Sequence, residues 1–144
     1  MFDIEFIGNP QIEFSELAVR GRITLGKFSE DFVAPLAFWA VNDYRWQWHE
    51  AAERILSGRE RSCFVAAMRE SPLDGAVFLW PAYKDGTSVY IQHKVLLPEN
   101  VKGSFDPSNP YAQIDERRIV AEEGEMISEW EVSVGDIARF LHAG

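Results

Sequence analysis

Residues 36–58, LAFWAVNDYRWQWHEAAERILSG, form the longest segment with a clear hydrophobic period, and this segment constrains the fold most. At about 3.6 residues per turn, one face carries apolar side chains and the opposite face carries polar ones. The apolar set is Val41, Tyr44, Trp48, Ala51, Ala52 and Ile55, and the polar set is His49, Glu50, Glu53 and Arg54. The pattern predicts an amphipathic helix, with Asn42 or Asp43 as its N-cap and Gly58 as the left-handed residue after its end.

Trp46 lies on the same predicted helix but points almost opposite Trp48. Two interpretations follow from this position. The ring is either covered by the N-terminal segment or a loop, or it is exposed as an anchor for a partner protein. Trp48, Trp80 and Trp130 each sit on an apolar face of a helix or strand, so we expect these three in the core.

A chain of 144 residues with 47% hydrophobic and 13% aromatic residues is expected to fold as one domain. The single cysteine, Cys63, excludes an intramolecular disulfide and lies in the apolar run CFVAAM, which favours a buried thiol and a reducing compartment. The N-terminus MFDIEF does not resemble a signal peptide, and no apolar run reaches the roughly 18 residues of a membrane span. We therefore expect a cytoplasmic protein with no membrane partner.

The formal net charge is −9, from 23 acidic against 14 basic residues. This balance disfavours binding to nucleic-acid phosphates or anionic lipid, and it suits a basic partner protein. A mildly acidic balance is also ordinary for soluble bacterial proteins, so the charge alone does not identify the partner.

The first 34 residues alternate apolar and polar side chains in short runs. Residues 2–7 and 11–15 flank the turn pair Asn9-Pro10, and residues 16–34 are interrupted by Gly21 and Gly26. Such runs predict short strands, with a bulge or tight turn at the glycines.

Three further strands are expected after the helix, in the order of a meander. Residues 62–68 and 76–83 are apolar on both faces, as in central strands, and Pro81 predicts a bulge or a point where the second strand leaves the sheet. A turn at Asp85-Gly86 leads to a third strand over residues 88–97. There Val89, Ile91, His93 and Val95 are expected in the core, and Tyr90, Gln92 and Lys94 on a solvated face.

The rest of the chain predicts a loop, a hairpin and a short helix. Residues 98–114 hold three prolines, with Phe105 and Tyr111 as apolar contacts to the body; a loop of this length either has a function or is a plain crossover. Residues 117–120 and 126–132 are expected to form a hairpin in which Arg117 or Arg118 faces Glu129 or Glu131. Ser133 with Asp136 resembles a capping box that starts a C-terminal helix.

The chain carries no sequence motif for catalysis, cofactor binding or metal binding, because HExxH, paired cysteines, GxxxxGK, GxGxxG and GxSxG are all missing. His49, His93 and His142 are expected on a helix face, inside a strand and at the C-terminal end, where structural or surface roles outweigh roles as ligand or base. We therefore expect no enzyme activity, no cofactor and no metal.

Five segments, in their order and spacing, resemble an immunity protein of bacterial contact-dependent growth inhibition. They are LAFW followed by NDY and Trp48, then CFVAAM, VFLWPAY, VYIQHKVLL and ISEWEVSVGDIARFL. The resemblance implies an α+β fold of two antiparallel sheets with one main helix and a C-terminal helix, similar to the Whirly architecture. It also implies that the chain neutralises a C-terminal toxin domain that cleaves small-subunit ribosomal RNA, by blocking its active or substrate-binding site.

A nuclease toxin presents a basic surface to RNA, so acidic and exposed aromatic residues are the candidate toxin contacts. Between residues 115 and 131 the chain has seven acids against two bases. Either the glutamates of the turn AEEGE face the toxin, or the turn is merely solvated while the two arginines pair with strand glutamates. The candidate contacts are Asp115, Glu116, Glu122, Glu123, Glu125, Trp46 and Glu53.

A second function stays open, because the Whirly resemblance also implies a domain that binds single-stranded nucleic acid. Such binding requires a basic groove with stacking aromatics, and Tyr90, Gln92 and Lys94 supply a fragment of one. The net charge of −9 argues against this alternative. The expected partner is therefore a basic nuclease toxin domain and not nucleic acid, with the chain monomeric when free.

Overall fold

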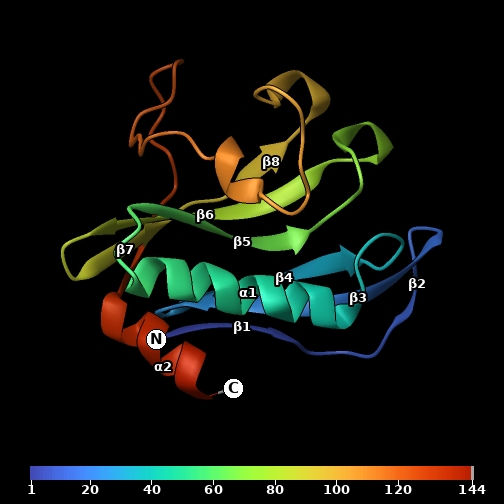
Figure 1. Ribbon diagram of the computed structural model, residues 1–144, viewed down its shortest axis with the longest axis horizontal. Helices are drawn as coiled ribbons and strands as arrows, with labels where there is room; N and C mark the ends of the chain where they lie inside the picture. The colour runs from blue at the N-terminus through green and yellow to red at the C-terminus, as the bar shows by residue number, and fades with distance from the viewer. Residues whose placement is uncertain (144) are drawn as a thin grey trace.

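The computed structural model describes residues 1–143 and contains two antiparallel sheets and two helices, the predicted α+β architecture (Figure 1). The first sheet contains β1 (Phe2–Phe6), β2 (Gln11–Glu13), β3 (Glu16–Leu25) and β4 (Phe28–Pro35). The second contains β5 (Arg61–Ala67), β6 (Val77–Asp85), β7 (Ser88–Ile91), β8 (Lys94–Leu96) and β9 (Trp130–Ser133). The helices are α1 (Val41–Leu56) and α2 (Val134–Ala143), and short 3-10 turns lie at η1 (Pro72–Asp74), η2 (Pro98–Asn100) and η3 (Pro110–Gln113).

In the first sheet, β1, β2 and β4 all pair with the long strand β3. Gly26, with φ 67°, makes the predicted tight turn between β3 and β4, since glycine adopts left-handed backbone without strain. Gly21 lies in the middle of β3 beneath the ring of Phe32, and an added Cβ would be 2.4 Å from that ring. Packing against Phe32, and not a turn, therefore requires glycine at position 21.

In the second sheet, the predicted meander is correct in order, but its third strand is split. β7 pairs with residues 82–85 of β6 and β8 with residues 77–79, and Gln92 and His93 separate the two. Pro81, which has no N–H to donate, lies at this break, and its carbonyl accepts from the Gln92 N–H at 2.9 Å. The alternation shifts by one residue here, so Gln92 is buried while His93 and Val95 are exposed, contrary to the prediction.

The predicted main helix is confirmed as α1, together with its apolar face. Its start differs, because Ala40 is the N-cap and the Asp43 carboxylate accepts from the Ala40 N–H at 2.8 Å from inside the first turn. Gly58, with φ 97°, follows the helix end as predicted. Figure 1 shows α1 in front of the sheets, running along β5. Its buried residues are Tyr44, Gln47, Trp48, Ala51, Ala52 and Ile55.

Residues 117–132 form only the turn end of the predicted hairpin, where the Ile127 N–H donates to the Ile119 carbonyl at 2.9 Å. A single bridge joins Val120 to Met126, and β9 pairs with β7 instead. The prediction of a capping box before α2 is correct: the Ser133 N–H donates to the Asp136 carboxylate and the Asp136 N–H donates to Ser133 Oγ, both at 2.9 Å. These reciprocal bonds satisfy N–H groups that no helical carbonyl can reach.

The core fills the space between the two sheets and beneath α1. Trp48 and Trp80 are 2% and 1% exposed, as predicted, whereas Trp130 is half-buried at the edge and stacks on Phe28 with ring centroids 4.3 Å apart. Cys63 is buried as well, and this burial raises the pKa of its thiol. The thiol therefore stays protonated and acts as a small apolar side chain.

Candidate functional site

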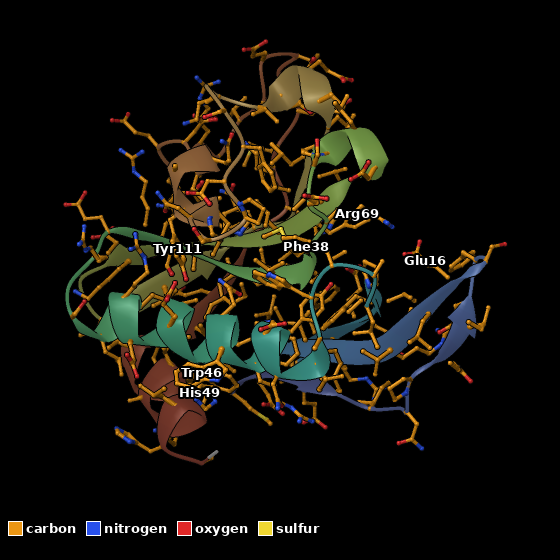
Figure 2. All side chains as sticks on the ribbon, turned by 45° about the vertical axis from the view of Figure 1, so that its right-hand side comes forward. Glu16, Phe38, Trp46, His49, Arg69 and Tyr111 are labelled. Atoms are coloured by element: carbon orange, nitrogen blue, oxygen red, sulfur yellow. The ribbon has the colours of Figure 1, made fainter. Side chains whose placement is uncertain are left out.

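The outward face of α1 carries an exposed tryptophan. Trp46 is 76% exposed, and Phe38, in the loop before the helix, is 43% exposed. Figure 2 labels Trp46 on α1, and its high exposure places the ring on the outward side of the helix. The interpretation that a loop or the N-terminal segment covers Trp46 is therefore wrong. Large aromatic side chains left in water are typical of protein-binding surfaces.

Acidic side chains lie on one side of this tryptophan, and Arg45 and His49 lie on the other. Glu50 and Glu53 follow Trp46 at positions i+4 and i+7, so the three share one face of α1. A groove of about 430 Å³ separates Trp46 from the loop that contains Asp106. This surface, the Trp46 face, consists of Phe38, Asp43, Trp46, Glu50 and Glu53.

A chain of hydrogen bonds holds one acid of the Trp46 face in place. Tyr111 Oη donates to Glu50 at 2.7 Å, and Gln47 Nε2 donates to Tyr111 Oη at 3.2 Å. The Arg54 guanidinium lies 3.8 Å from the centroid of the Tyr111 ring. Burial, and then the hydrogen bond to Glu50, raises the pKa of Tyr111, so the phenol stays protonated and continues to donate. Tyr111 thus attaches the 98–114 loop to α1, as predicted.

The two acids that begin the acidic segment are paired with bases from distant parts of the sequence. Asp115 accepts from Lys102 Nζ at 2.7 Å and lies 3.6 Å from Lys94 Nζ. Glu116 lies 3.8 Å from Arg61. The hydrogen bond from Lys102 holds the pKa of Asp115 below its ordinary value. Asp115 and Glu116 therefore contribute less negative field than the sequence predicts.

The tip of the acidic segment is the turn that contains Glu122, Glu123 and Glu125, all of them exposed. Glu122 lies 3.9 Å from Arg118, whereas Glu123 and Glu125 form no ion pair within residues 1–143. Figure 1 shows this turn at the top of the view, on the far side of β6 from α1. The candidate toxin contacts therefore fall into two separate groups, one on the acidic segment and one, with Trp46 and Glu53, on α1.

The face that the nucleic-acid alternative requires is not open. The Arg117 guanidinium lies 3.8 Å from the centroid of the Tyr90 ring, and Arg117 Nε also donates to Glu129 at 2.9 Å, one of the predicted ion pairs. Gln92 is 7% exposed and donates to the Arg118 carbonyl at 2.9 Å and to Glu129 at 2.8 Å. The prediction of a solvated face at Tyr90, Gln92 and Lys94 is therefore wrong, because residues 117–129 cover it.

The histidines have packing roles where the structure describes their contacts. His49 meets the Phe140 ring edge-on at 5.8 Å, and His93 stacks on Phe78 with ring centroids 6.1 Å apart. His93 is exposed on one side, but desolvation by the protein around its other side, where Phe78 and Trp80 pack, lowers the pKa of the imidazole and favours its neutral form. Among residues 1–143, no three His, Cys, Asp or Glu side chains are grouped so that they could hold a metal ion.

Within the same described part of the chain, neither helix is long and apolar enough to cross a membrane.

Sequence reasoning missed Phe38, Asp43, Glu50 and Asp106 as neighbours of Trp46. Glu50 could have been found from its i+4 spacing, since the same helical period places it on the face of Trp46. Asp106 carries no such signal, because it reaches the groove through a loop attached by Tyr111.

Two sheets, two helices and exposed aromatic and acidic surfaces define a small domain suited to binding another protein. The sequence model of the CdiI N-terminal domain family matches residues 34–140, so the chain belongs to this family. The Immunity protein CdiI of Enterobacter cloacae subsp. cloacae is 29% identical over 143 residues, which cover 99% of this chain and 98% of that protein. A chain of the CdiA-CT/CdiI toxin and immunity complex from Enterobacter cloacae superposes with a TM-score of 0.89, at 29% identity and with 99% and 97% of the two chains covered.

The resemblance to immunity proteins of contact-dependent growth inhibition is therefore confirmed. Immunity proteins are inhibitors rather than enzymes, which agrees with the expectation that this chain has no catalytic activity.

Proposed function

We propose that this chain binds the C-terminal toxin domain of a contact-dependent growth inhibition system and neutralises it in a stoichiometric complex. The observation that carries the proposal is the match, over 99% of this chain, to a chain of a solved toxin and immunity complex. In this proposal the 144 residues act as one domain, monomeric until the toxin binds. The place of action is the cytoplasm, where an unpaired thiol such as Cys63 persists.

The proposed toxin is a basic nuclease that cleaves ribosomal RNA. A net charge of −9 supports this choice, because a domain that grips RNA phosphates must present a positive surface. An acidic inhibitor associates quickly with such a surface and competes with the substrate for it. Neutralisation then consists of covering the active or substrate-binding site and requires no chemistry from the inhibitor.

The Trp46 face supplies the proposed anchor of the complex, with Trp46 buried against the toxin and Glu53 facing toxin bases. This assignment is supported by the 76% exposure of Trp46 beside a groove rimmed by acids. The acidic segment supplies long-range attraction, mainly through Glu123 and Glu125 at its tip, while Asp115 and Glu116 add contacts at its base.

Titration calorimetry with the toxin domain encoded beside this chain tests the proposal. We expect one-to-one binding with a Kd below about 1 μM, and loss of RNA cleavage when the chain is equimolar with the toxin. No binding at micromolar concentration would contradict the immunity role. A toxin that is bound but cleaves no ribosomal RNA would contradict only its nuclease character.

Competition with labelled single-stranded RNA separates blocking from remote inhibition. If the toxin site is covered, adding the chain must displace RNA from the toxin. The chain alone serves as the control and should show no RNA affinity that weakens with salt. A ternary complex of chain, toxin and RNA would contradict the blocking mechanism.

A further inference from the structure

A cleft of about 410 Å³ opens between β4 of the first sheet and strands β5 and β6 of the second. Its floor is mainly apolar, with Val33 and Ala67 on opposite walls, and the β2–β3 hairpin forms its mouth. Figure 2 shows Glu16 and Arg69 facing each other at this end of the molecule, well away from Trp46. This β4 cleft is therefore separate from the Trp46 face.

Unpartnered polar atoms gather at the β4 cleft. Within residues 1–143, four buried side-chain nitrogen or oxygen atoms have no hydrogen-bond partner, and three of them belong to residues that line it. These atoms are Glu13 Oε2, Arg69 Nε and Trp80 Nε1. Glu13 and Arg69 bond Arg20 and Glu16 through their other side-chain atoms, so Trp80 is the residue among the three whose side chain lacks any partner within residues 1–143.

Trp80 gives the sharpest of these signals. Its side chain is 1% exposed, yet its indole N–H donates to no atom of residues 1–143. Trp48 shows the usual solution, since its indole N–H donates to the Val65 carbonyl at 2.8 Å. Trp80 therefore lines the cleft and has an unused hydrogen-bond donor.

The backbone of β4 adds N–H and C=O groups that are not used in pairing with another strand. β4 pairs only with β3 among the described strands, and the bond from the Leu36 N–H to the Leu17 carbonyl fixes which β4 residues face β3. By the alternation of an antiparallel ladder, Asp31 and Val33 turn their N–H and C=O groups away from β3, and both residues line the cleft. An extended peptide can satisfy such groups, whereas a compact ligand satisfies few of them.

The charge of the mouth selects a basic occupant. Glu13 is paired with Arg20, Glu16 with Arg69 and Asp31 with Arg22. Glu30 is exposed beside them and forms no ion pair within residues 1–143. Three of the four carboxylates that line the cleft are thus paired with arginines, and Glu30 leaves the rim with one excess negative charge.

We propose that the β4 cleft receives an extended segment of the toxin domain, with a carbonyl that accepts from the Trp80 indole N–H and a basic side chain that pairs with Glu30. The inference rests on the proposed function and adds a second contact to the Trp46 face. The apolar floor accommodates one uncharged side chain of the same segment.

Nuclear magnetic resonance of the nitrogen-15-labelled chain with unlabelled toxin domain tests the inference directly. Trp80→Phe identifies the Trp80 indole resonance by its disappearance. On complex formation this resonance should shift, whereas that of Trp48, already bonded to Val65, should not. A complex that leaves the Trp80 resonance in place overturns the inference while the immunity role stands. If no complex forms, the result contradicts both the proposed function and the toxin segment as the occupant of the β4 cleft.

Affinity measurements with two charge reversals give an independent readout. Glu30→Lys should weaken toxin binding about tenfold or more, because it places a base against the basic segment. Glu99→Lys, an equal change of charge at an exposed position outside the cleft, should stay within about twofold of wild type. Equal affinities of the two variants would overturn the inference, provided that both melt at the wild-type temperature.

Discussion

The side-chain amide of Gln47 bonds to the backbone of Val65 and Cys63 in β5 as a neighbouring strand would. Gln47 Oε1 accepts from the Val65 N–H at 2.8 Å, and Gln47 Nε2 donates to the Cys63 carbonyl at 2.7 Å. β5 is the edge strand of the second sheet, and α1 closes this edge with side chains instead of backbone. Tyr44 Oη extends the same arrangement by accepting from the Met68 N–H at 3.1 Å. The helix that presents Trp46 outward is thus fixed to the sheet by hydrogen bonds as well as by packing.

Gln47→Ala should lower the free energy of unfolding by about 1–3 kcal/mol, because it leaves the buried Val65 N–H and Cys63 carbonyl without partners. Urea unfolding followed by circular dichroism measures the change. Gln11→Ala, at an exposed glutamine of β2, serves as the control and should change stability by less than about 0.5 kcal/mol. Equal stability of Gln47→Ala and wild type would show that water replaces the amide.

Trp48 and Trp46, two residues apart on α1, should respond oppositely to substitution. Trp48→Ala should destabilise by about 3–5 kcal/mol, since it empties a core site and leaves the Val65 carbonyl unpaired. Trp46→Ala should leave urea unfolding within about 0.5 kcal/mol of wild type but weaken toxin binding by about 2 kcal/mol or more. Wild-type toxin affinity in Trp46→Ala would remove the Trp46 face from the interface.

The helices, the order of the strands and most of the core were predictable because they depend on local periodicity. α1 and the capping box of α2 each follow from residues within one or two turns. The break at Gln92 was not predictable, because the alternation over residues 88–97 continues through it. It arises from Pro81 on the neighbouring strand, which has no N–H to donate. Strand pairing, and not the local pattern, decides that Gln92 lies opposite Pro81.

The candidate site was predictable only in part, for the same reason. Trp46 follows from the helical period, but the ion pairs of Asp115 with Lys102 and Lys94 join residues that become neighbours only after folding. Gln47 gives no sequence signal either, since glutamine on a helix is usually solvated. Its amide is buried here because it lies opposite the free edge of β5.

The stability of the chain should fall as pH rises from about 4 to 6, because of Asp3. Burial, and then the adjacent Glu5 carboxyl, raises the pKa of Asp3 from 3.8 to about 6. The folded state therefore binds this proton more tightly than the unfolded state, and the resulting stabilisation is lost through that window. Asp3→Asn should flatten the unfolding midpoint between pH 4 and 6 and raise it at pH 7.

Asp136 serves as a control, because its pKa is shifted in the opposite direction to that of Asp3. Hydrogen bonds from Ser133 and the nearby Arg139 lower the pKa of Asp136 to about 2. Its stabilisation is present above about pH 4 and is lost as the pH falls toward 2. Asp136→Asn should therefore lower the unfolding midpoint by a constant amount above about pH 4 and flatten its fall toward pH 2. A changed slope between pH 4 and 6 in this variant would contradict the assignment to Asp3.

Replacing Glu122, Glu123 and Glu125 with glutamine should slow association with the toxin without changing thermal unfolding. These side chains are exposed, and only Glu122 has a base nearby, at 3.9 Å, so their charge acts on the partner and not on the fold. The association rate should fall about tenfold at low ionic strength, and the gap should close near 0.5 M salt, where charges are screened within about 5 Å. A triple neutralisation of Glu60, Asp85 and Glu99, with the same change in net charge at other exposed positions, separates local from overall charge. If both triple variants associate equally fast, the attraction comes from the net charge of −9 and the turn has no special role.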